Sequence, residues 1–256
     1  MAVEVRYYTD PACPWSWSLE PTVRRLMVEF GEQLSWTYVM GGLTRNFAEQ
    51  GDKQGVYSRQ MAHWLDVADV GGMPLDPRLW TEGPITSSYP GCMAVKAASE
   101  QRDPYVYLRE LREGLFCFRR KLDTTEALVE AARVAGLNVE RFRVDLGSNA
   151  IVEAFGNDLE DFRSRELELP ALVIGDRVVA GFQPYEAYAE AVGLSAAAAR
   201  MSPLEALRRF GRMATREVEE VCGLRGPQAS AQLWQLALDW QVKPVRVLTG
   251  ELWELA

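Results

Sequence analysis

The position of the strand-forming segments is the feature that most constrains the fold. β-Branched and aromatic residues alternate at residues 2–8 and 34–40, which is typical of strands. Strand signals then fade and return only after residue 165, where two short apolar runs flank Gly175 and Asp176, a pair typical of a two-residue hairpin turn. The long stretch between these segments has helical composition and spacing. The sequence therefore predicts an α/β fold in which a β-α-β unit and a later hairpin are separated by a large all-helical insertion.

Residues 195–256 follow a different pattern. Helices are predicted from Ser202, over 215–222 and over 228–240, before a small hairpin that turns at Thr249 and Gly250. This order resembles a winged-helix module, which raises the question of DNA binding. Eight basic side chains stand against seven acidic ones in residues 200–256, a balance of +1, and the helix over 228–240 has no Arg or Lys. Because phosphate contacts need clustered basic side chains, and because the whole chain has a net charge of −8, we expect no nucleic-acid partner.

Cys13 is the residue with the clearest chemical potential. It lies in the segment Asp10-Pro11-Ala12-Cys13-Pro14-Trp15-Ser16-Trp17, between the first strand and a helix predicted to run from Pro14 to Phe30. Unpaired backbone N–H groups and the helix dipole favour negative charge at such a position. The sequence therefore predicts a lowered thiol pKa for Cys13 and a nucleophilic thiolate.

The other three cysteines, Cys92, Cys117 and Cys222, are far apart and form no C-x-x-C pair. No apolar run reaches the ~18 residues of a membrane span, and the N-terminus lacks the pattern of a signal peptide. We therefore expect reduced thiols, no membrane association and a cytoplasmic protein. The single histidine, His63, stands alone on a predicted helix surface, so no metal site is expected.

Three segments resemble the DsbA-like branch of the thioredoxin superfamily. They are Asp10-Pro11-Ala12-Cys13-Pro14-Trp15, Ser87-Ser88-Tyr89-Pro90-Gly91-Cys92-Met93-Ala94-Val95-Lys96-Ala97-Ala98 and Leu169-Pro170-Ala171. Over residues 3–193 the chain is most similar to the cytoplasmic subgroup that contains FrnE-like oxidoreductases and YjbH-type protease adaptors. The resemblance implies a thioredoxin fold with a helical insertion. The expected parts are a thioredoxin-like domain at 1–42 and 165–194, an insertion domain at 43–164 and a small C-terminal helical module at 195–256.

The resemblance also implies roles for individual residues. Cys13 would be the catalytic nucleophile, and Ser16 would occupy the second catalytic position of the family's C-x-x-C motif. In the family the peptide bond before Pro170 is cis, and the preceding backbone pairs with an extended peptide or with glutathione. The residues expected to contact the substrate are Pro14, Trp15, Leu169 and Pro170.

Ser16 is a departure from the family's motif, because a serine cannot attack the mixed disulfide that a second cysteine would resolve. Three functions remain open. The first is a monothiol oxidoreductase that acts on a protein or peptide thiol or disulfide, with glutathione as the candidate co-substrate. The second is a non-catalytic, YjbH-like adaptor that holds a partner protein. The third is a glutathione-dependent transferase or isomerase similar to the kappa class, and no tightly bound cofactor is expected in any of the three.

The remaining cysteines and the two motif tryptophans have competing interpretations. Cys92 is the candidate resolving thiol for Cys13, or else a small core residue on an apolar helix face. Cys117 and Cys222 are expected to be packing residues. Trp17 is expected in the core, and Trp15 on the surface, where it would help to form a docking face.

Overall fold

A four-stranded sheet lies at the centre of the computed structural model, which describes residues 2–196 and 201–256. The strand order is β2-β1-β3-β4, with β1 and β2 parallel, β3 antiparallel to β1, and β4 antiparallel to β3. The predicted hairpin at Gly175 is present, since Ile174 pairs with Arg177 across a two-residue turn. The predicted α/β fold is thus confirmed. The strands are β1 (Val3–Thr9), β2 (Leu34–Met40), β3 (Ala171–Ile174) and β4 (Arg177–Ala180).

The segment after β1 was expected to be one helix, and it is two. α1 (Pro14–Ser18) ends at Leu19, and α2 (Glu20–Glu29) begins immediately afterwards. Pro21 explains the break, because it has no N–H to donate to the preceding turn and disfavours helical backbone in the residue before it. Within the first turn of α2 the missing N–H is harmless. A short 3₁₀ helix, η1 (Gly31–Gln33), follows α2, and α10 (Tyr185–Val192) follows β4.

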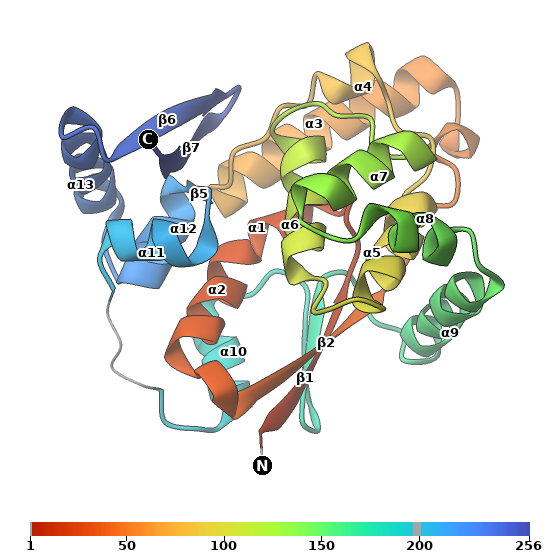
Figure 1. Ribbon diagram of the computed structural model, residues 1–256, viewed down its shortest axis with the longest axis horizontal. Coiled ribbons are helices and arrows are strands. Elements are labelled where there is room, and N and C mark those ends of the chain that lie inside the picture. Colours follow the sequence, from red (N-terminus) through yellow and green to blue (C-terminus); the bar gives the residue numbers. More distant parts are fainter. Residues whose placement is uncertain (1, 197–200) are drawn as a thin grey trace.

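The predicted helical insertion between β2 and β3 is present and lies to the upper right in Figure 1. Its first long helix begins later than predicted, because Asp52 caps it by accepting the N–H groups of Gln54 and Gly55. The helix over 139–146 was not predicted. The elements are η2 (Phe47–Gln50), α3 (Lys53–Gly71), α4 (Leu79–Glu82), α5 (Tyr89–Ser99), α6 (Tyr105–Phe116), α7 (Thr125–Val134), α8 (Val139–Leu146) and α9 (Asn149–Ser164).

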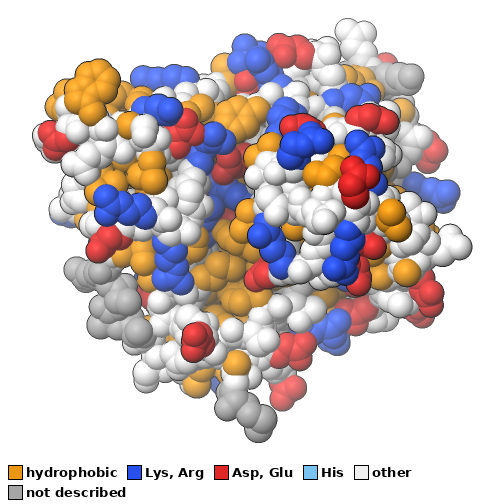
Figure 2. All heavy atoms as spheres, in the orientation of Figure 1, with side chains coloured by type: hydrophobic (Ala, Val, Ile, Leu, Met, Phe, Trp, Pro, Cys, Tyr) orange, Lys and Arg blue, Asp and Glu red, His pale blue; other side chains and the backbone are white. Residues whose placement is uncertain are grey.

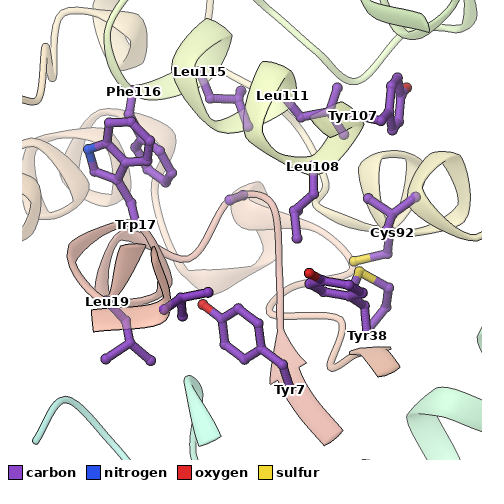
Figure 3. Close-up of a cluster of buried hydrophobic side chains, with 14 of the residues drawn as sticks. Tyr7, Trp17, Leu19, Tyr38, Cys92, Tyr107, Leu108, Leu111, Leu115 and Phe116 are labelled. Carbon is purple, nitrogen blue, oxygen red and sulfur yellow. The ribbon is translucent and has the colours of Figure 1, made fainter. Parts of the chain in front are cut away.

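One large hydrophobic cluster joins the sheet to the insertion (Figure 3). Trp17 of α1 is fully buried, as predicted, and stacks on Phe116 of α6 with ring centroids 5.8 Å apart. Tyr7 of β1 and Leu108 of α6 belong to the same cluster. The insertion therefore does not have a separate core but covers the sheet and helps to bury the start of α1.

The C-terminal part has the predicted order of three helices and a hairpin, together with a short strand that was not predicted. The hairpin turn was predicted at Thr249 and Gly250, but Gly250 pairs with Val247 inside the ladder. The reason is tertiary, because the Thr249 hydroxyl accepts the N–H of Leu75 at 2.7 Å and so holds the tip against the insertion. The elements are α11 (Pro203–Phe210), β5 (Met213–Ala214), α12 (Thr215–Cys222), α13 (Gly226–Leu238), β6 (Val242–Val247) and β7 (Gly250–Leu255).

Buried ion pairs attach the C-terminal part to the rest of the chain. Glu217 of α12 is fully buried and lies 3.0 Å from Arg24 of α2 and 2.7 Å from Arg109 of α6. Arg109 also approaches Glu20, which pairs with the buried Arg112. Since charges out of water need partners, this network ties three separate stretches of sequence together at one point.

The surface mixes charges of both signs. On the face drawn in Figure 2, acidic and basic side chains are interspersed, and hydrophobic side chains show both in the hollow between the C-terminal part and the insertion and on the outer edge of the C-terminal part. No helix in the described part of the chain combines the length and apolar character needed to cross a membrane.

Candidate functional site

Cys13 lies where the sequence predicted, between β1 and α1. It is the N-cap residue of α1, and its sulfur accepts the backbone N–H of Ser16 at 3.4 Å. Pro14 occupies the first turn of the helix, where no N–H is needed. A turn closed by the Cys13 N–H and the carbonyl of Asp10, 3.2 Å apart, precedes the helix and fixes the direction of the cysteine.

The pKa of the Cys13 thiol shifts in the direction opposite to the one predicted. Cys13 is only 2% exposed, and burial raises the pKa of its thiol above the ordinary value, although the hydrogen bond from Ser16 offsets part of this. The expected lowering is therefore wrong. The physical reason is that α1 has only five residues, so its N-terminus supplies a small favourable field, whereas desolvation of a thiolate at this depth is costly.

Ser16 lowers the pKa of the Cys13 thiol through its side chain and through its backbone N–H. The Ser16 hydroxyl is buried, and its contacts within the described residues fall short of a hydrogen bond of good geometry. The carbonyl of Ser16 accepts the hydroxyl of Tyr7 at 3.2 Å, which ties α1 to the central strand. A catalytic role for the Ser16 hydroxyl stays a prediction.

The Leu169–Pro170 peptide bond is cis. The carbonyl of Pro170 accepts the N–H of Gly181 at 2.8 Å, which anchors the segment to the end of β4. Leu169 packs closely against Gly41 after β2, since a Cβ on that glycine would come within 2.8 Å of the leucine side chain. The absence of a side chain at Gly41 therefore lets Leu169 approach the end of β2.

A pocket of about 380 Å³ brings most of the predicted site together. Four of the six predicted residues line it, whereas Ser16 and Pro170 lie behind its wall and are not among its lining residues. Several lining residues were not predicted, because they come from distant helices and loops that no local pattern links. The lining consists of Cys13, Pro14, Trp15, Gly42, Leu43, Thr44, Phe47, Gln60, His63, Phe162, Leu167, Glu168 and Leu169.

Asp10 is a buried residue that accepts several hydrogen bonds close to Cys13, and this role was not predicted from the sequence. Its carboxylate accepts hydrogen bonds from the N–H groups of Ala12 and Leu43, from the Ser88 hydroxyl and from the Cys92 thiol, over distances of 2.6–3.2 Å. Burial raises the pKa of Asp10, and these donors only partly offset the effect. The carboxylate thereby joins the end of β1 to the segment after β2 and to α5.

Cys92 is a core residue, as one of its two interpretations predicted. It is fully buried, and its thiol donates to Asp10 Oδ2 at 3.2 Å. Burial and the neighbouring Asp10 carboxylate raise the pKa of the Cys92 thiol well above its ordinary value. All four cysteines are free and buried, so the expectation of unpaired thiols is confirmed.

Trp15 was expected on the surface as part of a docking face, and it is half-buried and forms one wall of the pocket. Its ring lies 6.3 Å from that of His63 on α3 and 5.6 Å from that of Phe182 after β4, so it is held between two rings. His63 was expected to be an isolated surface residue, but it is half-buried and lines the pocket. The contact between α3 and α1 is a tertiary contact, which the local sequence pattern did not predict.

This sheet order, a cysteine at the start of the first helix and a cis-proline before the third strand define a thioredoxin-like protein. A family model described as Thioredoxin matches residues 7–189. The ClpXP adapter protein SpxH of Halalkalibacterium halodurans is 31% identical over 270 residues, which cover 98% of this chain and 88% of that protein. The chain therefore belongs to the thioredoxin family and, within it, to the family of the SpxH proteins.

Solved structures show the same fold at lower identity. A putative protein disulfide isomerase from Nitrosomonas europaea is 19% identical with a TM-score of 0.65, over 75% of this chain and 97% of that chain. The cytosolic disulfide reductase DsbM from Pseudomonas aeruginosa, solved with GSH, is 20% identical with a TM-score of 0.60, over 75% of this chain and 100% of that one. At these identities the likeness concerns the fold alone.

Proposed function

We propose that this chain is a protein-binding adaptor for ClpXP, which uses the thioredoxin-like scaffold to hold a partner without exchanging disulfides. The observation that carries the proposal is the extent of the similarity. The SpxH relative matches 98% of the chain, whereas the thioredoxin family model ends at residue 189 and the solved disulfide enzymes cover 75%. The C-terminal part, attached through Glu217, is thus shared with an adaptor rather than required by the redox fold.

The chemistry of the site supports binding over catalysis. Cys13 is buried, the pKa of its thiol is raised by that burial, and the motif has a serine where a resolving cysteine would stand. A partner can still dock there non-covalently. An extended segment can pair with backbone beside Leu169 while one of its side chains enters the pocket, as in other strand-addition complexes.

The test compares two activities in the same samples: delivery of a partner protein to ClpXP, and thiol–disulfide exchange. Purified wild-type and Cys13→Ser proteins are assayed for binding to ClpX, for ClpXP-dependent turnover of captured partner proteins, and for insulin reduction. We expect both proteins to bind ClpX and to promote turnover equally, with no insulin reduction above background. Absence of ClpX binding, or turnover that disappears in Cys13→Ser, would falsify the adaptor proposal.

The second candidate is the monothiol oxidoreductase, and the presence of Cys13 among the residues that line the pocket favours it. In that case the Cys13 thiolate would attack a disulfide of the substrate, break its S–S bond and release one of its sulfurs as a thiolate. An external thiol would then attack the mixed disulfide, free Cys13 and remain joined to the substrate sulfur. The rate of iodoacetamide alkylation measured against pH separates the two functions. A thiol pKa at or above the ordinary ~8.5 supports the adaptor, and a value clearly below it supports the enzyme.

Glutathione-dependent chemistry is the least favoured function. Glutathione carries two carboxylates, and the described residues that line the pocket include no Lys or Arg to hold them. Calorimetric titration with glutathione tests this directly, and measurable binding that Cys13→Ser abolishes would restore the transferase alternative. We place the adaptor in the cytoplasm, which agrees with its four free thiols.

A further inference from the structure

The pocket beside Cys13 carries a carboxylate without a counter-charge. Glu168 is exposed and lines the pocket next to Leu169, and its side chain forms no ion pair and no hydrogen bond within residues 2–196 and 201–256. Glu168 is the single acidic residue among the described residues that line the pocket, and none of them is Lys or Arg. An uncompensated negative charge at the rim of a mostly apolar pocket favours a positively charged occupant.

The pocket wall formed by Trp15 is a second feature that favours a positively charged ligand. Its indole contacts the ring of His63 edge-on and that of Phe182 at a tilt, with centroid distances of 6.3 Å and 5.6 Å, so two neighbours restrain its orientation before any ligand arrives. The face of an indole attracts a cation through its quadrupole, and among the side chains the planar guanidinium also stacks on it. A restrained ring costs little entropy when a ligand docks.

We propose that this pocket receives an arginine side chain from an extended segment of the partner protein. The inference rests on the proposed adaptor function and names the chemistry of the segment that docks beside Leu169. The guanidinium would stack on Trp15 while its N–H groups donate to the Glu168 carboxylate, a combination that lysine reproduces only as a point charge. Acidic segments would be repelled by Glu168.

The experiment uses the full-length protein and dye-labelled pentapeptides in which valine and alanine flank one variable central residue. The central residue is arginine, its neutral isostere citrulline, lysine or glutamate, and binding is measured by fluorescence anisotropy. We expect the arginine peptide to bind about 3- to 10-fold more tightly than the citrulline peptide, with lysine between them and glutamate weakest. Raising the salt concentration should reduce the difference.

Variants of the protein locate the effect. Glu168→Gln should remove most of the advantage of the arginine peptide over the citrulline peptide, because only the contact with Trp15 then favours the cation, and it should leave binding of the citrulline peptide unchanged. Glu168→Lys should reverse the preference toward the glutamate peptide. The matched control is Glu166→Gln, which removes the same charge two residues away at an exposed position outside the pocket, and it should bind like the wild type.

Two results would overturn the inference. One is equal binding of the arginine and citrulline peptides to the wild type, and the other is failure of every peptide to bind. Neither result touches the adaptor function, which depends on ClpX binding and partner turnover in the separate assay. Conversely, loss of that activity with a retained arginine preference would remove the adaptor function and leave the chemistry of the pocket intact.

Discussion

Replacing Glu217 by alanine should be the most damaging single change at the junction between the C-terminal part and the rest of the protein. The carboxylate is completely buried between Arg24 and Arg109, and it also accepts the N–H of Ala214 at 2.7 Å. Removing one member of a buried ion pair costs about 3 to 5 kcal/mol, because the remaining charges stay out of water. Loss of a hydrogen bond at a helix start adds about 1 kcal/mol. We therefore expect the free energy of unfolding to fall by about 4 to 6 kcal/mol.

Urea unfolding followed by far-ultraviolet circular dichroism measures this loss. With a denaturant slope of about 3 kcal/mol per molar, the midpoint should fall by roughly 1.3 to 2 M. The matched control is Glu219→Ala on the same helix, whose partner Arg216 is 43% exposed, and it should cost no more than about 1 kcal/mol. A loss below about 1 kcal/mol for Glu217→Ala, or equal losses for the two variants, would refute the view that the buried network holds the parts together.

Three further predictions concern the site and its support. Gly71→Ala puts a Cβ 2.5 Å from that of Ser18, where α3 crosses α1, so overpacking should cost about 1 to 3 kcal/mol and lower the Tm by about 2 to 10 °C in a thermal melt. Burial alone would raise the pKa of Glu20, but the charges of Arg112 and its neighbours outweigh burial and lower it. The ionised Glu20 therefore contributes its full stabilisation above the ordinary pKa of the group. This contribution is lost as the pH falls through the lower pKa of the folded state. Urea titrations at pH 7, 4 and 3 should show the free energy of unfolding fall progressively below the ordinary pKa of 4.5, and Glu20→Gln should show less of this fall. Ser16→Cys supplies a second thiol but not access to Cys13, so insulin reduction should stay near background, and strong activity would mean that the missing cysteine alone keeps the scaffold silent.

Local patterns predicted what depends on local physics. Alternating residues identified β1 and β2, and the Gly-Asp pair identified the turn between β3 and β4, because side-chain period and turn chemistry act over a few residues. The N-cap position of Cys13 was predictable for the same reason. The break between α1 and α2 could also have been predicted from the sequence, because helices usually end at or before the residue that precedes a proline such as Pro21.

Long-range contacts set the features that were missed. Whether Cys13 has a low or a raised thiol pKa depends on its burial, which no pattern within its own helix reports. His63 and Glu168 reach the same pocket from α3 and from the segment before β3, and neither carries a local signal for this. The shifted hairpin turn has the same origin, since Thr249 is held by Leu75.

Burial of Cys13 also bears on how the protein behaves under oxidants. Peroxide attacks thiolates, so a sulfur that is shielded and stays protonated at neutral pH is oxidised slowly to the sulfenic acid. Mass spectrometry of peroxide-treated protein should find the Cys13 peptide unmodified at doses that oxidise an exposed, low-pKa thiol. The surface beside Cys13 would then be unchanged by oxidative stress. The protein would still bind its partner under conditions that oxidise and inactivate thiol enzymes in the same cell.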